Sequence, residues 1–403
     1  MKKNLLNLAA FFAAFSGLQA QTVTTSDEFL SALNNGTGDI VITIPASTTI
    51  DVSDEAIVTP AIQASVNSIT IQGEGDSSVL KSKGAYDLTA VSELNAFKFN
   101  NLTLTREAED SDYALAVKSS IKEITLEKCR IHSMRGVLRL RDNADMVIEK
   151  ININNCLVSK IGSYSLISGE KGKVTSLNIT NNTFYDFSTT SKAKNLITFK
   201  PAESGEQDVR LTNFCMENNT FNKVVMGSAD KAANYLVDFG KIGSSAIPVS
   251  GSFSFQNNLL GEPMEGITKI FSKIPQSTDE NYEQCVINGN FISESWTIDE
   301  NSKKYFTDEE VLNQAPAVNV LFKDAANGDF TIAKEQAYSN AGDPRWKTGS
   351  TNIQTENVYE PKIIAVEYYN VAGLKQDKPV KGLNIIRQIR ENGTIKTIKS
   401  IVR

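Results

Sequence analysis

The sequence contains a single histidine among 403 residues, and only two tryptophans. The histidine is His132, between Ile131 and Ser133 in the stretch RIHSM. Ser–His–Asp catalysis needs a nucleophile set beside the histidine, and the chain has no nucleophile elbow. We therefore expect His132 to be a turn residue rather than part of a catalytic triad.

Long apolar stretches are also missing, with one exception at the start. Lys2 and Lys3 precede an apolar run at 5–15, and small residues then lead to Ala20, a cleavage point before Gln21. The run is too short for a helix that spans a bilayer. Because Gln21 rather than a cysteine follows the cleavage point, no lipid anchor is expected. The sequence predicts a signal peptide at 1–20 and an exported chain without a transmembrane span.

An excess of positive charge is absent as well. The chain has 41 Lys and Arg against 47 Asp and Glu, a formal net charge of −6. Loss of the signal peptide, which holds two Lys and no acidic residue, takes this to −8. Non-specific binding of nucleic acid depends on basic surface. Nucleic acid is therefore not an expected partner.

Cysteine is scarce for an exported chain of this length. The four cysteines are Cys129, Cys156, Cys215 and Cys285, and each lies in a strand-like run. This context favours small buried thiols. Cys129 and Cys156 would be neighbours if their strands stack, so a bridge between them stays open as an alternative. None of the spacings suits zinc.

What the sequence does contain is a repeat. The stretches LNITNNTF (177–184), FCMENNTF (214–221) and FSFQNNLL (253–260) share the pattern apolar-x-apolar-x-Asn-Asn-x-apolar, and looser copies extend it from 69 to 292 at intervals of about 26 to 39 residues. Alternation with period two predicts strands with one buried face. One such unit per turn predicts a β-solenoid.

The Asn pair of each copy falls where the strand should bend. Asn tolerates the left-handed backbone that a turn needs and bonds to neighbouring backbone groups. Asn182, Asn219, Asn258 and Asn290 share one register. We expect these four side chains to stack on successive coils as a ladder of amides.

A second set of strands follows the first, and loops of variable length after it explain the uneven intervals. Its members are 113–117, 137–140, 164–167, 195–199, 235–239 and 268–271. The chain from about 41 to 345 resembles right-handed parallel β-helices of the pectate-lyase-like superfamily, and SITIQGEG followed by SSVLKSKG looks like an early coil. The predicted fold class is all-β: a right-handed parallel β-helix (21–346) followed by a small C-terminal β-module.

Two further stretches at the C-terminal end carry resemblances. Residues 321–346, with NGDF and GDPRW, resemble the closing segment of secreted β-helix proteins, which implies a cap over the last coil. A polar linker (347–360) precedes a β-module at 361–403 with strand-like runs at 363–369, 383–388 and 394–402. This module resembles sorting domains of the type IX secretion system. That implies secretion machinery as a partner, and a secreted or outer-surface location in a Gram-negative bacterium, with the periplasm as an alternative. The alternative interpretation is a small β-module with no role in sorting.

The second set of strands also predicts a binding face. Aligning the strands by their last inward apolar residue puts Val117, Leu140, Ile167 and Phe199 in one row. The outward positions then gather the basic side chains Lys118, Arg139, Arg141 and Lys200, with Asp238 on the same face. Arginine binds carboxylates and sulfates through two parallel bonds, so such a patch would suit an anionic polysaccharide. The alternative is an ordinary solvated face.

A metal site is a weaker hypothesis. The run REAEDSD supplies Glu107, Glu109, Asp110 and Asp112, whose carboxylates suit calcium. A loop of like charges is more often merely solvated. Trp296 and Trp346 are candidate platforms for sugar stacking, and packing is the competing role for Trp346.

Three functions stay open. The first is recognition of an extracellular or cell-surface polysaccharide, in particular an acidic glycan. The second is a polysaccharide lyase that uses Arg or Lys as the base of a β-elimination. The third is a structural or adhesive protein without a glycan site. The Gly-His-Gly stretch of polygalacturonase-like hydrolases and the WIDH-like segment of classical pectate lyases are both absent from the sequence.

Overall fold

The computed structural model describes residues 19–53, 63–89, 93–107, 112–162, 165–187, 195–199, 211–225, 234–238, 251–264, 268–271, 285–293, 296, 321–332, 341–347, 363–370, 374–390 and 395–402. The chain divides into two compact units, Met1–Gly349 and Ser350–Arg403, and each is described by itself. Among the described residues, no helix has the length and apolar character needed to cross a bilayer.

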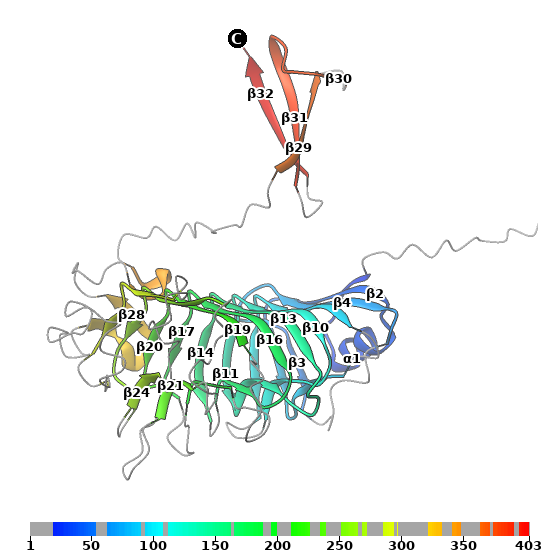
Figure 1. Ribbon diagram of the computed structural model, residues 1–403. Coiled ribbons are helices and arrows are strands. Elements are labelled where there is room, and N and C mark those ends of the chain that lie inside the picture. The colour runs from blue at the N-terminus through cyan, green and yellow to red at the C-terminus, as the bar shows by residue number, and fades with distance from the viewer. Residues whose placement is uncertain are drawn as a thin grey trace, which may run out of the picture. The chain divides into compact units, whose positions relative to one another are not determined.

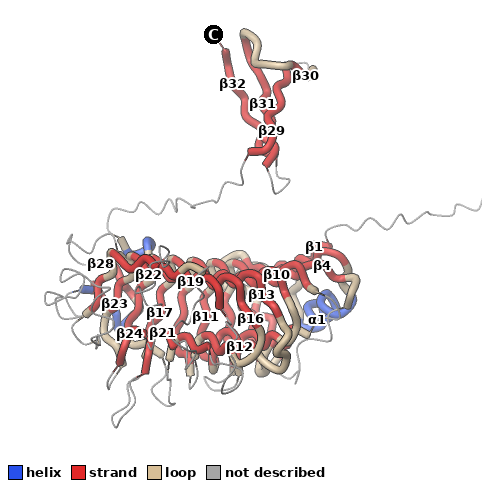
Figure 2. The backbone as a smooth tube through the Cα atoms, in the orientation of Figure 1, coloured by secondary structure: helices blue, strands red, loops and turns tan. Residues whose placement is uncertain are grey.

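Within these ranges the first unit is a solenoid of three parallel sheets, A, B and C, that run side by side (Figures 1 and 2). Sheet A contains β1 (Gln19–Thr22), β2 (Gly38–Ile44), β4 (Val66–Gly73), β7 (Leu94–Asn100), β10 (Ile121–Glu127), β13 (Val147–Asn154), β16 (Lys173–Thr180), β19 (Leu211–Glu217), β22 (Phe253–Gln256) and β25 (Cys285–Asn288). The prediction of an all-β chain with a parallel β-solenoid is confirmed.

Sheets B and C complete each coil. Sheet B contains β3 (Thr49–Val52), β5 (Val79–Ser82), β8 (Thr103–Arg106), β11 (Arg130–Met134), β14 (Leu157–Ile161), β17 (Thr183–Tyr185), β20 (Thr220–Asn222), β23 (Leu259–Leu260) and β26 (Phe291–Ile292). Sheet C contains β6 (Tyr86–Leu88), β9 (Tyr113–Val117), β12 (Gly136–Leu140), β15 (Ile167–Gly169), β18 (Ile197–Phe199), β21 (Asn234–Asp238) and β24 (Thr268–Phe271).

The core is built from rows of inward side chains on consecutive coils. Ile124 pairs with Ile151, which in turn pairs with Leu177, and all three are fully buried. The rings of Phe184 and Phe221 stack with 5.2 Å between their centroids. Burying one such side chain stabilises the fold by about 1.5–3 kcal/mol. The alternation read from the sequence is therefore the source of the solenoid's stability.

From β7 onward, each passage from sheet A to sheet B turns on one residue with a left-handed backbone. This residue is Asn in most described coils, with φ between 53° and 58°, and the positions are Asn101, Asn155, Asn181, Asn218 and Asn257. Lys128 (φ 54°) and Gly289 (φ 64°) take the same place in two others. The repeat predicted as one strand is thus two strands joined at a corner, because the first Asn of the pair breaks the extended backbone.

The second Asn of each pair forms the expected ladder. Asn182, Asn219, Asn258 and Asn290 are fully buried. Each of the first three donates Nδ2 to the Oδ1 of the next at 3.0 Å, and its backbone N–H donates to the same oxygen at 3.0 Å. Asn182 Oδ1 also accepts the backbone N–H of Cys156 at 2.8 Å. The ladder prediction is confirmed.

The first coil is covered by a helix for which the sequence analysis made no prediction. α1 (Ser26–Asn35) begins at a capping box in which Thr25 and Glu28 bond to each other's backbone N–H. Phe29, Ala32 and Leu33 are buried and belong to the solenoid core. Gln19 and Ala20 pair with Ile40 and Val41, so the predicted cleavage point after Ala20 falls within β1.

The closing segment comprises β27 (Phe322–Asp324), η1 (Ala325–Asn327), β28 (Asp329–Ile332) and η3 (Pro344–Trp346). Its ring of Phe330 lies 5.0 Å from that of Tyr185 and 5.7 Å from that of Trp346. Tyr185 is on the outer side of β17, because the buried Phe184 before it faces the core. The described closing segment therefore lies along the outer face of sheet B, whereas we expected a cap over the last coil.

The second unit is an antiparallel sheet in the order β30–β29–β31–β32. Its strands are β29 (Ile363–Asn370), β30 (Lys375–Gln376), β31 (Gly382–Arg390) and β32 (Ile395–Val402). Three of them coincide with the runs predicted at 363–369, 383–388 and 394–402. The small C-terminal β-module is confirmed, and its sorting role stays a prediction.

Candidate functional site

The described members of the predicted binding set lie on the outer side of sheet C or directly after its strands. Its strand register places Ala116, Arg139, Ser168, Thr198 and Asp238 in one row. Arg139 and Asp238 therefore share a face but are separated by the strands β15 and β18.

The register predicted for β15 is wrong by two residues. Leu140 pairs with Gly169 and not with Ile167. Ile167 does face inward, but it pairs with Leu138, and the last inward position of β15 is Gly169, which has no side chain to mark it as apolar. The residue that follows the row on this strand is Glu170 rather than Ser168, and this brings a carboxylate next to Arg139.

Arg139 is held by Glu170 through two parallel bonds. Nε donates to Oε1 at 2.8 Å and Nη2 donates to Oε2 at 3.0 Å. The guanidinium carbon lies 5.9 Å from the centre of the Tyr113 ring, and Ser168 Oγ donates to Glu170 Oε1 at 3.2 Å. The hydrogen bonds with Glu170 raise the pKa of Arg139. About a third of each of the two side chains is exposed, 28% for Arg139 and 34% for Glu170.

Two further cations of the predicted patch share a carboxylate. Lys118 Nζ lies 2.7 Å from Asp87 Oδ2 and 3.6 Å from Asp142 Oδ2. Arg141 Nε donates to Asp142 Oδ2 at 2.8 Å, and this bond lowers the pKa of Asp142. Three cations thus meet three carboxylates. We name Asp87, Lys118, Arg139, Arg141, Asp142 and Glu170 the ion-pair face.

The predicted patch is therefore charge-balanced, and sequence reasoning missed its acidic half. Asp142 could have been found, because it directly follows Arg141. Asp87 and Glu170 come from other coils and depend on the register of sheet C. Of the remaining predicted residues, Asp238 accepts a bond from Asn195 Nδ2 at 2.9 Å. Lys200 lies outside the described residues.

The described residues of the predicted calcium site do not form a cluster of carboxylates. Glu109 and Asp110 lie outside the described residues, and Glu107 is exposed. Asp112 Oδ1 accepts the backbone N–H of Tyr113 at 2.7 Å. The buried guanidinium of Arg106 adjoins the run and would repel a cation. Among the described residues, no group of three or more His, Cys, Asp or Glu could hold a metal ion.

His132 lies within strand β11 and not in a turn, so that prediction is wrong. Its Nδ1 lies 3.0 Å from Ser133 Oγ and 3.3 Å from Thr105 Oγ1. Partial burial and the nearby charges of Arg130 and Lys160 lower its pKa. The turn signal belongs to Ser133, which has φ 58°. The imidazole thus has two hydroxyl groups within hydrogen-bond distance of its Nδ1.

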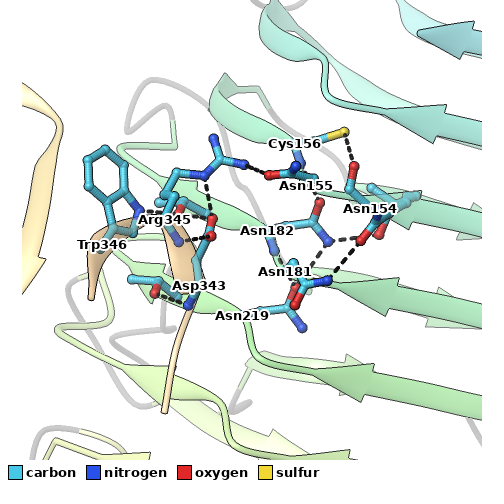
Figure 3. A network of polar contacts seen from close by, with 12 residues as sticks. Asn154, Asn155, Cys156, Asn181, Asn182, Asn219, Asp343, Arg345 and Trp346 are labelled. Carbon is cyan, nitrogen blue, oxygen red and sulfur yellow. Dashed lines mark hydrogen bonds and ion pairs between the residues drawn. The ribbon is translucent and has the colours of Figure 1, made fainter. Parts of the chain in front are cut away.

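A second polar cluster lies where the closing segment meets sheet B (Figure 3). Asp343 is 2% exposed. Its Oδ2 accepts Thr183 Oγ1 at 2.8 Å and lies 2.9 Å from Arg345 Nε, and its Oδ1 accepts the backbone N–H of Arg345 at 3.0 Å. The Asp343 backbone N–H donates to Thr220 Oγ1 at 2.9 Å. Burial raises the pKa of Asp343.

Neither tryptophan is arranged as an open platform for a sugar. Trp346 Nε1 donates to Thr183 Oγ1 at 2.6 Å, and its ring packs on Phe330. Trp296 is 4% exposed and donates Nε1 to the carbonyl of Gly261 at 2.8 Å. Arg345, beside Trp346, reaches Asn155 Oδ1 with Nη2 at 2.5 Å. We name Asp343, Arg345 and Trp346, with Thr183, Thr220 and Asn155, the closing-segment seam.

Two family models match the solenoid. Residues 58–187 match a domain of unknown function (DUF4957), and residues 214–346 match another domain of unknown function (DUF5123). No curated protein and no solved structure matches the chain. Sheets A, B and C continue from the first matched stretch into the second, and the seam ties Asp343 of the second to Thr183 of the first. The two stretches are consecutive parts of one solenoid.

Proposed function

We propose that the protein recognises an extended polysaccharide on the ion-pair face of sheet C. The observation that carries this proposal is the Arg139–Glu170 pair, which presents a planar guanidinium and a carboxylate side by side on the outer face. Neighbouring strands of a sheet are about 4.7–4.9 Å apart. Charged donors and acceptors from β6, β9, β12 and β15 therefore recur along the solenoid axis, as a polymer laid on this face would require.

An acidic glycan is the ligand class that suits Arg139 best. A uronate or sulfate group can take the two parallel bonds that Glu170 now accepts. The exchange costs little, since a partly exposed ion pair contributes only about 0–1 kcal/mol. Glu170, once displaced, is free to accept bonds from sugar hydroxyl groups.

Catalysis by β-elimination is less well supported than binding. A lyase base must give up its proton, and Glu170 raises the pKa of Arg139. Lys118 is already engaged by two carboxylates, Asp87 and Asp142. A purely structural or adhesive role needs none of these contacts, so it is the hypothesis that remains if binding fails.

The location belongs to the same proposal. A signal peptide at 1–20 and a C-terminal module that resembles type IX sorting domains would place the protein outside a Gram-negative cell, with secretion machinery as a partner. The pectate-lyase-like superfamily is the matching proposal for the solenoid, because members of that group carry parallel β-helices.

One experiment separates the three functions. The mature protein is incubated with a panel of uronic-acid polysaccharides in the presence of calcium. Absorbance of the unsaturated product and retardation in gels cast with the polymers are recorded together. We expect retardation without absorbance growth, lost in Arg139→Ala. Absorbance growth would make the protein a lyase, and neither signal would leave the structural role.

The matched control is Arg130→Ala. Arg130 is also a partly exposed arginine on an outer face, and its Nε donates to Asp76 Oδ2 at 3.1 Å. It lies on sheet B, away from the ion-pair face. Retention should be unchanged in this variant, and an equal loss in both would mean that general surface charge holds the polymer.

A further inference from the structure

The ladder that begins with amides continues towards the N-terminus with sulfur. Arg130 pairs with Leu157, and Leu157 pairs with Thr183. The residues just before them, Cys129, Cys156 and Asn182, therefore follow one another on consecutive coils. The backbone agrees, because Leu157 N–H donates to the carbonyl of Cys129 at 2.9 Å.

The two thiols donate hydrogen bonds to backbone carbonyls, as the amides of the ladder do. Cys156 Sγ donates to the carbonyl of Leu126 at 3.5 Å, and Asn182 Nδ2 donates to the equivalent carbonyl of Ile153 at 2.8 Å. Cys129 Sγ donates to the carbonyl of Glu127 at 3.3 Å. Both cysteines are buried, with 2% and 0% exposure, and both are free thiols in this structure.

We infer that Cys129 and Cys156 are the site of a disulfide that links two consecutive coils when the chain folds under oxidising conditions. Adjacent strands place such residues about 4.7–4.9 Å apart, inside the Cα separation of about 4.4–6.8 Å that disulfides span. Cys215 and Cys285 do not lie on consecutive coils. They lie on β19 and β25, with β22 between them.

The reaction is an ordinary thiol–disulfide exchange. One protein thiolate attacks a small disulfide, forms a mixed disulfide and releases the first small thiol. The second protein thiolate then attacks the protein sulfur of the mixed disulfide and expels the second small thiol, so the small disulfide takes up the two electrons. Both sulfurs are buried in the folded protein, with 2% and 0% exposure of the two residues, so a small disulfide cannot reach either of them there. The bond must therefore form while the coils are closing. The inference depends on an oxidising compartment and not on the glycan.

The test uses the full-length chain and an oxidant of defined composition. Reduced, urea-unfolded protein is refolded in a mixture of oxidised and reduced glutathione, blocked with an alkylating reagent, digested and analysed by mass spectrometry. We expect a peptide pair joined through Cys129 and Cys156, with Cys215 and Cys285 alkylated. Four alkylated cysteines, or a bridge to Cys215 or Cys285, would overturn the inference.

Two controls keep the result independent of refolding yield. Folded reduced protein placed in the same glutathione mixture should keep all four thiols for hours, and rapid cross-linking there would contradict formation during closure. Protein collected from the periplasm of an oxidising host should carry the bridge, with a melting temperature several degrees higher than after reduction. This difference should vanish in Cys129→Ser and persist in Cys215→Ser.

Discussion

Two arginine–carboxylate pairs in this solenoid have the same chemistry and opposite surroundings. Arg139 and Glu170 on sheet C are 28% and 34% exposed. In the closing-segment seam, the side chain of Arg345 is 21% exposed and the side chain of its partner Asp343 only 1%. Water can replace either partner of the first pair. It cannot reach the carboxylate of the second.

The difference assigns the two pairs to different tasks. An exposed pair contributes little to folding and can exchange its carboxylate for one on a ligand. A buried pair gains little over an apolar contact, but losing one partner leaves an unpaired charge in a dry place. We therefore expect function to depend on Arg139 and folding to depend on Asp343.

The largest effect should come from Asp343→Ala. It leaves the Thr183 hydroxyl and the Arg345 backbone N–H without their acceptor, and it removes the carboxylate beside the Arg345 guanidinium, which keeps its bond to Asn155. We expect a loss of about 3–5 kcal/mol in the free energy of unfolding. Urea denaturation followed by circular dichroism measures it. Asp343→Asn retains an acceptor oxygen and should lose less. Equal stability of Asp343→Ala and the parent protein would contradict a structural role for the seam.

The next effect should come from the ladder. Asn219→Leu keeps the volume of the side chain but removes the oxygen that accepts the Asn182 backbone N–H. Asn182 Nδ2 loses the same acceptor but keeps its bond to the carbonyl of Ile153. A buried backbone donor without a partner costs about 1–3 kcal/mol, to be measured by the same denaturation. Asn178→Ala is the control, since Asn178 bonds to Asn152 on the partly exposed outer face of sheet A. A similar cost in both would mean that burial of the ladder is irrelevant.

Arg139→Ala should affect ligand binding more than stability. Because its ion pair is partly exposed, we expect a stability change of at most about 1 kcal/mol, together with loss of retention on acidic polysaccharide gels. Stability and retention are measured on the same preparation. A large loss of stability would place Arg139 with Asp343 as a structural residue and remove the contrast.

The smallest effect should be the pH-dependent contribution of the Asp51–Lys81 pair to stability. Bonds from Lys81 and Ser53 lower the pKa of Asp51 to about 2. A lowered carboxyl pKa adds stability above the unfolded value of about 3.9, and this contribution is lost as the pH falls towards 2. Lys81→Met should cost a few tenths of a kcal/mol at pH 7, since both side chains are more than a third exposed. The difference from the parent protein should shrink to a small fraction of its value as the pH falls to 2, and a constant difference would point to packing instead.

The solenoid was predictable because its signals are local and repeated. Alternation in stretches such as LNITNNTF gives strands, and the Asn pairs give both the left-handed corner at Asn181 and the buried rung at Asn182. Sequence reasoning did not separate the strands on either side of that corner, because Asn181 interrupts the extended backbone without interrupting the apolar pattern.

The ion-pair face was predictable only in part. Lys118, Arg139 and Arg141 were found from their outward phase. Glu170 was missed because the last inward position of β15 is Gly169, which carries no apolar side chain, so the inward row was ended two residues early at Ile167. The seam depends on contacts such as Arg345 with Asn155, 190 residues apart in sequence. No local pattern contains such a contact.

The Asn ladder also sets how the length of this protein can change. Each rung needs only an equivalent rung above and below it, so a whole extra coil restores every contact at the junction. A partial coil would leave an amide facing a gap. Growth and shortening should therefore occur in steps of one coil, while the loops beyond sheet C lengthen freely. Because every rung adds the same rise, the number of rungs also fixes the length of polymer that can lie along the solenoid.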